Sequence, residues 1–166
     1  MDQEHRLYAR TLRAGTADYR EQPGADGTSV EFEAALGEPV ATRVVAGRAT
    51  LDLDLRWSVF ELRIGNATRS YAPAPEALID VTGAPALYGL TARRLLAGGI
   101  RPGQARDVEI LRIGDDGEAR TLRGRVIWLG GREWRLLAPA EATGFAVRPD
   151  GAVANVQGAA ELIERG

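Results

Sequence analysis

Residues 78–103 read LIDVTGAPALYGLTARRLLAGGIRPG, and this stretch decides the fold because it holds the one clear helix signal in the chain. Pro85 suits the first turn of a helix, where the N–H that proline lacks would have no partner anyway. The pair Gly98 and Gly99 is typical of the end of a helix, because glycine readily adopts the conformation that terminates one. The sequence therefore predicts one helix over residues 85–97.

The predicted helix is amphipathic. At about 100° per residue, most of its apolar positions fall on one half of the cylinder. These positions are Leu87, Tyr88, Ala92, Leu95 and Leu96. Arg93 and Arg94 fall outside that half, and Leu90 is an apolar residue on the polar side. A helix with one apolar side needs a surface to pack against, which the rest of the chain must provide.

The sequence on both sides of the helix is typical of β-strands. Residues 48–57 show the clearest alternation of apolar and polar residues, which predicts a strand with one buried face. The apolar positions are Leu51, Leu53, Leu55 and Trp57. The alternation changes phase after this segment, so we expect a β-bulge or a sharp bend near Val59 and Phe60.

Three hairpins are predicted after the helix, because Asp-Gly and Gly-Gly pairs supply the positive φ angles of tight turns. The turns are Asp115-Asp116-Gly117, Gly130-Gly131 and Asp150-Gly151. In the last hairpin, a two-residue turn determines which residues share a face. Those residues are Phe145, Val147, Ala154 and Val156. Residues 160–165 are compatible with a last strand or a short helix.

Together these patterns predict a mainly β fold of the α+β class. We expect about nine to eleven strands, most of them joined by hairpins, in one large antiparallel sheet that curves into a half-barrel. The helix would pack on the concave face. The 166 residues are most simply one domain, residues 1–166, in which residues 1–13 form either a flexible arm or a first short element.

The composition excludes several classes of site. The net charge of −2 gives no electrostatic reason to expect nucleic acid as a partner. The chain has no cysteine and a single histidine, His5, so we expect no metal, no cofactor and no catalytic residue, and hence no enzyme. Without an apolar leader or a run of about 18 apolar residues, we expect a cytoplasmic protein with no transmembrane segment.

The aromatic residues leave two alternatives open. They are spread over the predicted sheet and helix and comprise Trp57, Phe60, Tyr71, Tyr88, Trp128, Trp134 and Phe145. They could fill the core completely, or several of them could line an apolar cavity under the helix, where small ligands usually bind.

Part of the helix stretch resembles a bacterial family of half-barrel proteins named for glycolipid binding, together with related domains of unknown function and the broader lipoprotein-carrier half-barrels. The residues that carry the resemblance are Ile79-Asp80-Val81, Pro85, Leu90 and Arg93-Arg94-Leu95. The resemblance implies a curved half-barrel that binds a lipid-like molecule without catalysis.

The sequence therefore predicts a binding protein for an apolar or amphiphilic small molecule. The expected lining residues are Trp57, Leu87, Tyr88, Leu95 and Trp128, with Arg93 or Arg94 meeting an anionic head group. The alternative is an interaction module with a filled core, which forms a homodimer or docks another protein through an edge strand or an apolar patch.

Overall fold

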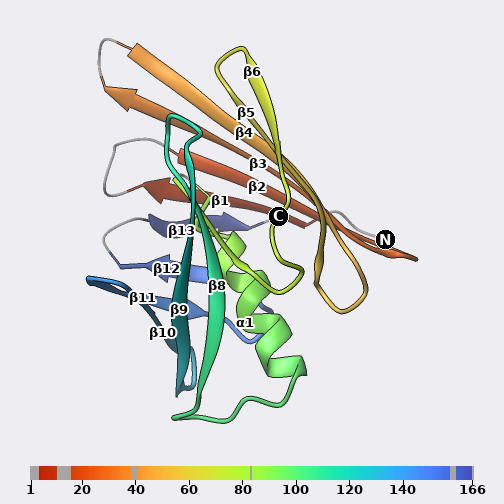
Figure 1. Cartoon of the computed structure of the whole chain (residues 1–166), viewed down its shortest axis with the longest axis vertical. Coiled ribbons are helices and arrows are strands. Elements are labelled where there is room, and N and C mark those ends of the chain that lie inside the picture. The colour runs from red at the N-terminus through yellow and green to blue at the C-terminus, as the bar shows by residue number, and fades with distance from the viewer. Residues whose placement is uncertain (1–3, 11–15, 39–40, 83, 158–159, 166) are drawn as a thin grey trace.

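The computed structural model describes residues 4–10, 16–38, 41–82, 84–157 and 160–165. These residues form thirteen strands in a single sheet and one α-helix (Figure 1). Before the helix α1 (Leu87–Ala97) come β1 (Glu4–Arg10), β2 (Thr16–Gly24), β3 (Gly27–Glu38), β4 (Ala41–Leu51), β5 (Trp57–Ile64), β6 (Ala67–Tyr71) and β7 (Leu78–Val81). After it come β8 (Ala105–Ile113), β9 (Ala119–Gly130), β10 (Glu133–Ala138), β11 (Glu141–Val147), β12 (Val153–Val156) and β13 (Ala160–Arg165).

The sheet is built from two antiparallel meanders joined through the first and last strands. The strand order is β6-β5-β4-β3-β2-β1-β13-β12-β11-β10-β9-β8-β7. Strands β7 and β8 are parallel to each other, because α1 connects them as a crossover. Two strands, β1 and β7, lie outside the segments that the sequence indicated as strands, and residues 160–165 form a strand rather than a helix. Residues 1–3 and 11–13 of the expected arm lie outside the described residues.

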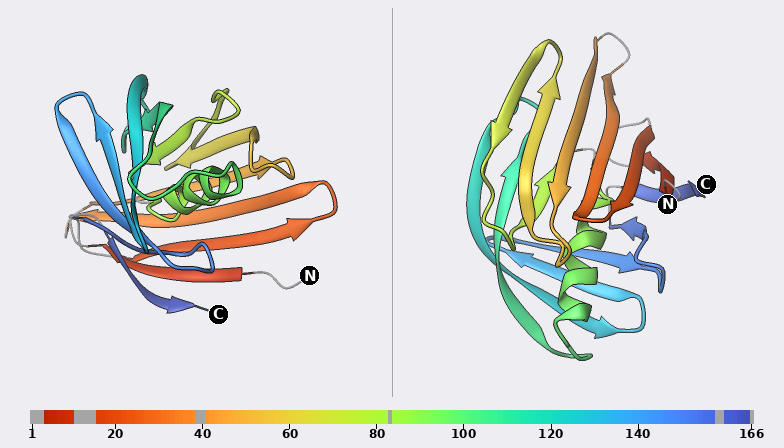
Figure 2. Two further views of the ribbon diagram at one scale, coloured as in Figure 1. Left: turned by 90° about the horizontal axis from the view of Figure 1, so that it is seen from below. Right: turned by 90° about the vertical axis from the view of Figure 1, so that its right-hand side faces the viewer.

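The sheet curves around α1, and both views in Figure 2 show the helix inside the trough. This confirms the predicted half-barrel with one helix on its concave face. The helix is buried on every side over its first two turns, so Leu90 is only 1% exposed although it was predicted on the polar side. Leu96, predicted on the apolar side, is 41% exposed because the last turn leaves the trough.

The prediction of one strand over residues 48–57 is wrong. Strand β4 ends at Leu51, and residues 52–56 form a loop in which the Asp52 carboxylate accepts hydrogen bonds from the N–H groups of Asp54 and Arg56. Leu53 is therefore 73% exposed, and Leu55 adopts a positive φ of 58°. A side chain that bonds to nearby backbone N–H groups stabilises a turn against a strand, and the alternation of apolar residues does not reveal it.

Two of the register shifts in the described sheet affect the predicted strand faces. The first shifts the β4–β5 register between Thr50 and Leu51, opposite Ser58, which is close to the position expected from the change of phase. The second lies in the hairpin that turns at Asp150-Gly151, where it pairs Val147 with Val153. Val153 is buried as a result, whereas Ala154, predicted on the inner face, is partly exposed. The three hairpin turns themselves are confirmed.

Candidate functional site

Three of the residues predicted to line a cavity are part of the packed core. Leu87 is fully buried on α1. Trp57 is 5% exposed, and its indole N–H donates a hydrogen bond of 2.8 Å to the carbonyl oxygen of Ala77. The Tyr88 hydroxyl donates to the Asp80 carboxylate over 2.9 Å, and burial raises the pKa of Tyr88 well above its usual value, with Asp80 adding to the shift. These side chains hold α1 and β5 in place.

The aromatic side chains form two groups that fill the inside of the half-barrel. Trp57 and Phe60 are packed edge to face, with ring centroids 5.8 Å apart. On the other side, Trp128 stacks on Trp134 at 5.6 Å, and Phe145 lies 6.1 Å from Trp134. Trp128 is partly exposed at the end of this second group. Where aromatic rings pack this closely, they act as core.

Arg93 is occupied by an ion pair inside the trough. Its guanidinium lies 2.5 Å from the carboxylate of Glu21 on β2, and that carboxylate also accepts a hydrogen bond of 2.9 Å from the Tyr19 hydroxyl. The Glu21 side chain is only 3% exposed. A buried ion pair of this kind positions the helix against the sheet and leaves Arg93 poorly placed to meet a ligand.

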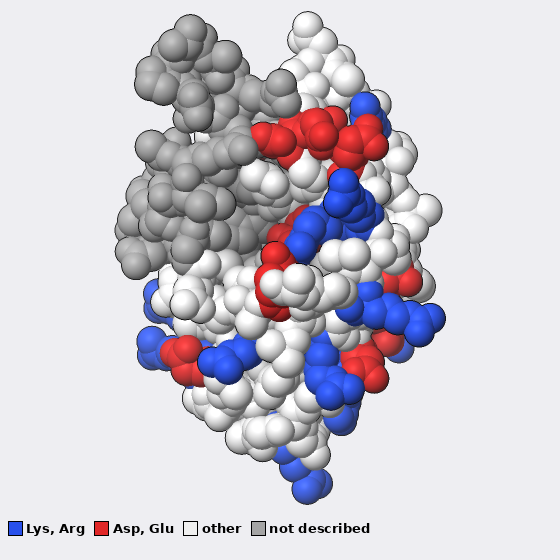
Figure 3. Space-filling model, turned by 60° about the vertical axis from the view of Figure 1, so that its left-hand side comes forward, with Lys and Arg blue, Asp and Glu red and all other residues white. Residues whose placement is uncertain are grey.

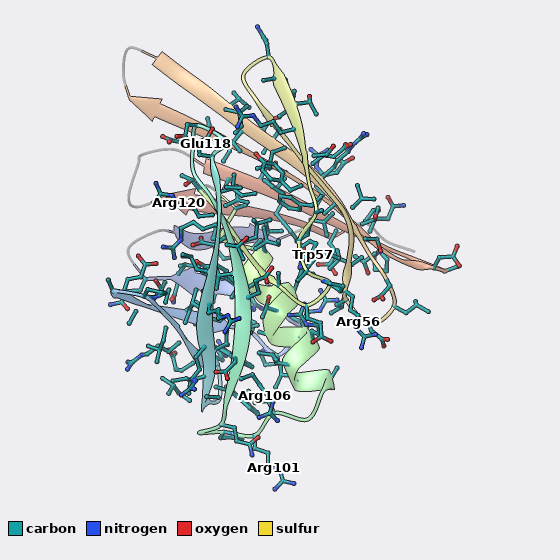
Figure 4. All side chains as sticks on the ribbon, in the orientation of Figure 1. Arg56, Trp57, Arg101, Arg106, Glu118 and Arg120 are labelled. Atoms are coloured by element: carbon teal, nitrogen blue, oxygen red, sulfur yellow. The ribbon has the colours of Figure 1, made fainter. Side chains whose placement is uncertain are left out.

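The remaining two predicted residues, Arg94 and Leu95, line an open cleft at the C-terminal end of α1. We call this the helix-end cleft; its volume is about 570 Å³. Its apolar lining consists of Leu53, Leu55, Ala74, Ala77, Leu95, Ala97 and Val108. Its charged lining consists of Asp54, Arg56, Glu76, Arg94, Arg106, Asp107 and Glu109. Figure 4 shows Arg56 and Arg106 beside the C-terminal half of α1.

Sequence reasoning missed most of this cleft. Its walls are the loop of residues 52–56, which was predicted to be a strand, the segment 74–77 and the start of β8. The first two of these segments are joined by hydrogen bonds of Trp57, one from its backbone N–H to the Pro75 carbonyl oxygen and one from its indole to that of Ala77. No local pattern in the sequence indicates that the loops of residues 52–56 and 74–77 are in contact.

The arginines of the cleft differ in their partners. Arg56 forms ion pairs with Asp54 at 2.8 Å and Glu76 at 3.3 Å. Arg94 instead donates to the carbonyl oxygens of Leu55, at 3.4 Å, and of Glu76. Burial lowers the pKa of Arg94 from its usual value, and the cleft therefore contains a half-buried cation bound by backbone dipoles.

Other hollows lie on the outer face of the sheet. One of about 480 Å³ crosses β2 to β6 and is lined by charged side chains. Their sign alternates between strands along the row Arg20, Glu31, Arg48 and Glu61. Its arginines pair with its own carboxylates, as in Arg48–Glu61 at 2.5 Å and Arg20–Asp18 at 3.5 Å. Cationic and anionic side chains also lie next to one another on the face shown in Figure 3. Such internally balanced surfaces hold little attraction for a charged ligand.

The described residues contain no group of three His, Cys, Asp or Glu side chains placed to hold a metal ion. Within the described part of the chain, no helix is long and apolar enough to cross a membrane.

Comparison with known proteins identifies a fold. No protein-family model matches the chain, and no curated protein does. A solved structure is similar, that of a DUF1089 family protein from Pseudomonas aeruginosa, with a TM-score of 0.63 and 17% sequence identity. The match covers 86% of this chain and 89% of that chain. The chain thus has the fold of a curled half-barrel found in a domain of unknown function, and at this identity the likeness concerns the fold alone.

Proposed function

We propose that this protein binds an apolar or amphiphilic small molecule, without catalysis, in the helix-end cleft. The observation that carries the proposal is the cleft itself, because about 570 Å³ lies within the usual range of small-ligand sites. Its apolar side chains Leu55, Leu95 and Val108 are partly buried and pack against the core, so they offer a ligand a firm apolar wall.

The location at the helix end follows from the packing of the trough. The first turns of α1 and the aromatic groups occupy the interior, and ligand space opens where the last turn leaves the sheet. The resemblance to half-barrels named for glycolipid binding supports a lipid-like or glycolipid-like ligand class. The cleft offers arginine, carboxylate and aliphatic side chains, with no nucleophile beside a general base among its described lining residues, and this supports binding over catalysis.

A neutral fluorescent probe tests the proposal. Purified protein, stripped of lipid, is titrated with N-phenyl-1-naphthylamine, and Ala97→Trp is compared with Ala119→Trp. Ala97 is exposed and lines the cleft, whereas Ala119 is an exposed alanine on β9 outside it. We expect the wild type and Ala119→Trp to bind the probe and Ala97→Trp to bind at least about tenfold more weakly, because the indole fills the cleft. Equal binding by the two variants would overturn the proposal.

The alternative function is an interaction module. Strand β6 is paired on one side only in the described sheet, and its residues Ala67, Thr68, Arg69 and Ser70 are exposed. An exposed edge strand can pair with a second chain. The mass in solution measured by light scattering tests this alternative, since edge pairing predicts a dimer.

A further inference from the structure

Arg94 differs from the other arginines that approach α1. Arg56 and Arg93 each form an ion pair with a carboxylate. Among the described residues, the partners of the Arg94 guanidinium are the carbonyl oxygens of Leu55 and Glu76, which are dipoles without net charge. Arg94 has no direct ion pair, and the nearby Glu76 carboxylate, which attracts it, is already paired with Arg56. A half-buried cation in this position is poorly compensated, so an anion that enters the cleft gains more from Arg94 than from an arginine already paired.

A buried polar group without a hydrogen-bond partner lies one turn before Arg94 on the helix. Thr91 is fully buried, and its hydroxyl has no hydrogen-bond partner in the described part of the protein. Residues three and four apart share a helix face, so Thr91 lies one turn before Arg94 and Leu95, toward the interior. The helix therefore runs from the fully buried Thr91, which is outside the cleft lining, to Arg94 and Leu95, which are part of it, and the lining residue Leu53 is 73% exposed.

The other charges of the cleft limit the charge of the ligand. Arg56 is neutralised by Asp54 and Glu76, and Asp107 pairs with Arg125 outside the cleft at 2.9 Å. The last turn of α1 also places the negative end of the helix dipole nearby, although Gly98, Gly99 and Ile100 donate to its carbonyls. Of the three cations of the cleft, Arg56 is paired and Arg106 is exposed to solvent, so the half-buried Arg94 matches one negative charge. The four carboxylates of the cleft, those of Asp54, Glu76, Asp107 and Glu109, disfavour a second one.

We infer that the ligand is an amphiphile with a single carboxylate head group, which binds with its head on Arg94 at the inner end of the cleft. Its chain runs along Leu55, Leu95 and Val108 and leaves past Leu53. This inference rests on the proposed function and adds to it the charge of the ligand and its direction in the cleft.

Displacement of N-phenyl-1-naphthylamine by four competitors tests the inference: dodecanoate, dodecanol, dodecyl phosphate and acetate. For the wild type we expect dodecanoate to bind at least about tenfold more tightly than dodecanol, from the strength of a charge-assisted hydrogen bond in a half-buried site. Dodecyl phosphate should bind more weakly than dodecanoate, and acetate should fail to displace the probe. Tighter binding of dodecyl phosphate than of dodecanoate, or displacement of the probe by acetate, would overturn the assignment of a singly charged amphiphile.

Variants separate the head group from the cleft. Arg94→Gln should weaken the binding of dodecanoate about tenfold or more and change the binding of dodecanol by less than about twofold. Unchanged dodecanol binding shows that the cleft is intact. Arg94→Lys, which keeps the charge, should retain a preference for dodecanoate. Arg120→Gln serves as the matched control at an exposed arginine on β9 outside the cleft and should change dodecanoate binding less than threefold.

The outcomes distinguish the two levels of proposal. If dodecanol and dodecanoate bind equally and Arg94→Gln changes neither, the head-group inference fails and the binding function stands. If no competitor displaces the probe and Ala97→Trp has no effect on it, the proposed function itself fails.

Discussion

Replacement of Gly89 by alanine tests how tightly α1 is seated in the half-barrel. Glycine weakens a helix, so an alanine at an exposed helical position would stabilise it by up to about 1 kcal/mol. Gly89 is not such a position, because α1 meets the β11–β12 turn there. A Cβ at this residue would lie 2.6 Å from the carbonyl oxygen of Gly151 and 3.2 Å from a methyl group of Val153.

The size of the effect follows from that contact. Since the neighbour at 2.6 Å is a backbone atom, the turn or the helix must move by about half an ångström or more, and overpacking of this kind costs up to about 3 kcal/mol. The turn has little freedom, because Gly151 has a φ of 85° and its N–H is bonded to Arg148. After the gain in helix propensity is subtracted, Gly89→Ala should destabilise the protein by about 2 kcal/mol.

Urea unfolding followed by tryptophan fluorescence measures this change, with Gly98→Ala as the control. Gly98 is exposed at the helix end with a φ of −77°, and a Cβ there would have no atom nearer than 3.4 Å. The control should stay within about 0.5 kcal/mol of the wild type, while the midpoint of Gly89→Ala falls by about 1 M. If Gly89→Ala proved as stable as the control, the close seating of α1 described here would be refuted.

Three further predictions concern the side chains around the trough. Arg93→Gln should cost about 3 kcal/mol because it removes the Arg93 charge from the buried Glu21 carboxylate, and a double-mutant cycle with Glu21→Gln should recover part of that cost. The buried phenol of Tyr88 keeps its proton above pH ~10 in the folded state but loses it in the unfolded state, so stability should fall as the pH rises past that value. Thermal melts of Tyr88→Phe against pH should show a smaller alkaline loss. Trp57→Phe removes the donor to the buried Ala77 carbonyl, and we expect a loss of about 1–3 kcal/mol in urea unfolding together with weaker probe binding.

The elements that the sequence predicted well are those defined by neighbours along the chain. Pro85 and the pair Gly98 and Gly99 enclose the observed helix, and the turns of three hairpins fall on the glycines that were expected to form them. Each of these signals is a conformational preference of one or two residues, which does not depend on contacts with the rest of the fold. The half-barrel followed because many hairpins and one amphipathic helix have few ways to pack.

The errors have a common cause as well. The alternation of Leu53 and Leu55 with polar residues is the same in a strand and in the observed loop, and the choice was made by the hydrogen bonds of Asp52. Leu90 was assigned to a polar face because a single apolar stripe was assumed, whereas the sheet encloses the first turns of α1 on all sides.

Of the predicted site, the sequence by itself determined that arginines would lie on the last turns of a helix inside a curved sheet. Only the tertiary structure decided that Arg93 would pair with Glu21, which lies 72 residues away along the chain. It also decided that Arg94 would donate hydrogen bonds to backbone carbonyl oxygens of two loops, those of Leu55 and Glu76. The two arginines are adjacent and chemically identical. They differ in their partners because different distant segments of the chain pack against each side of the helix. A local sequence pattern does not show which distant segments these will be.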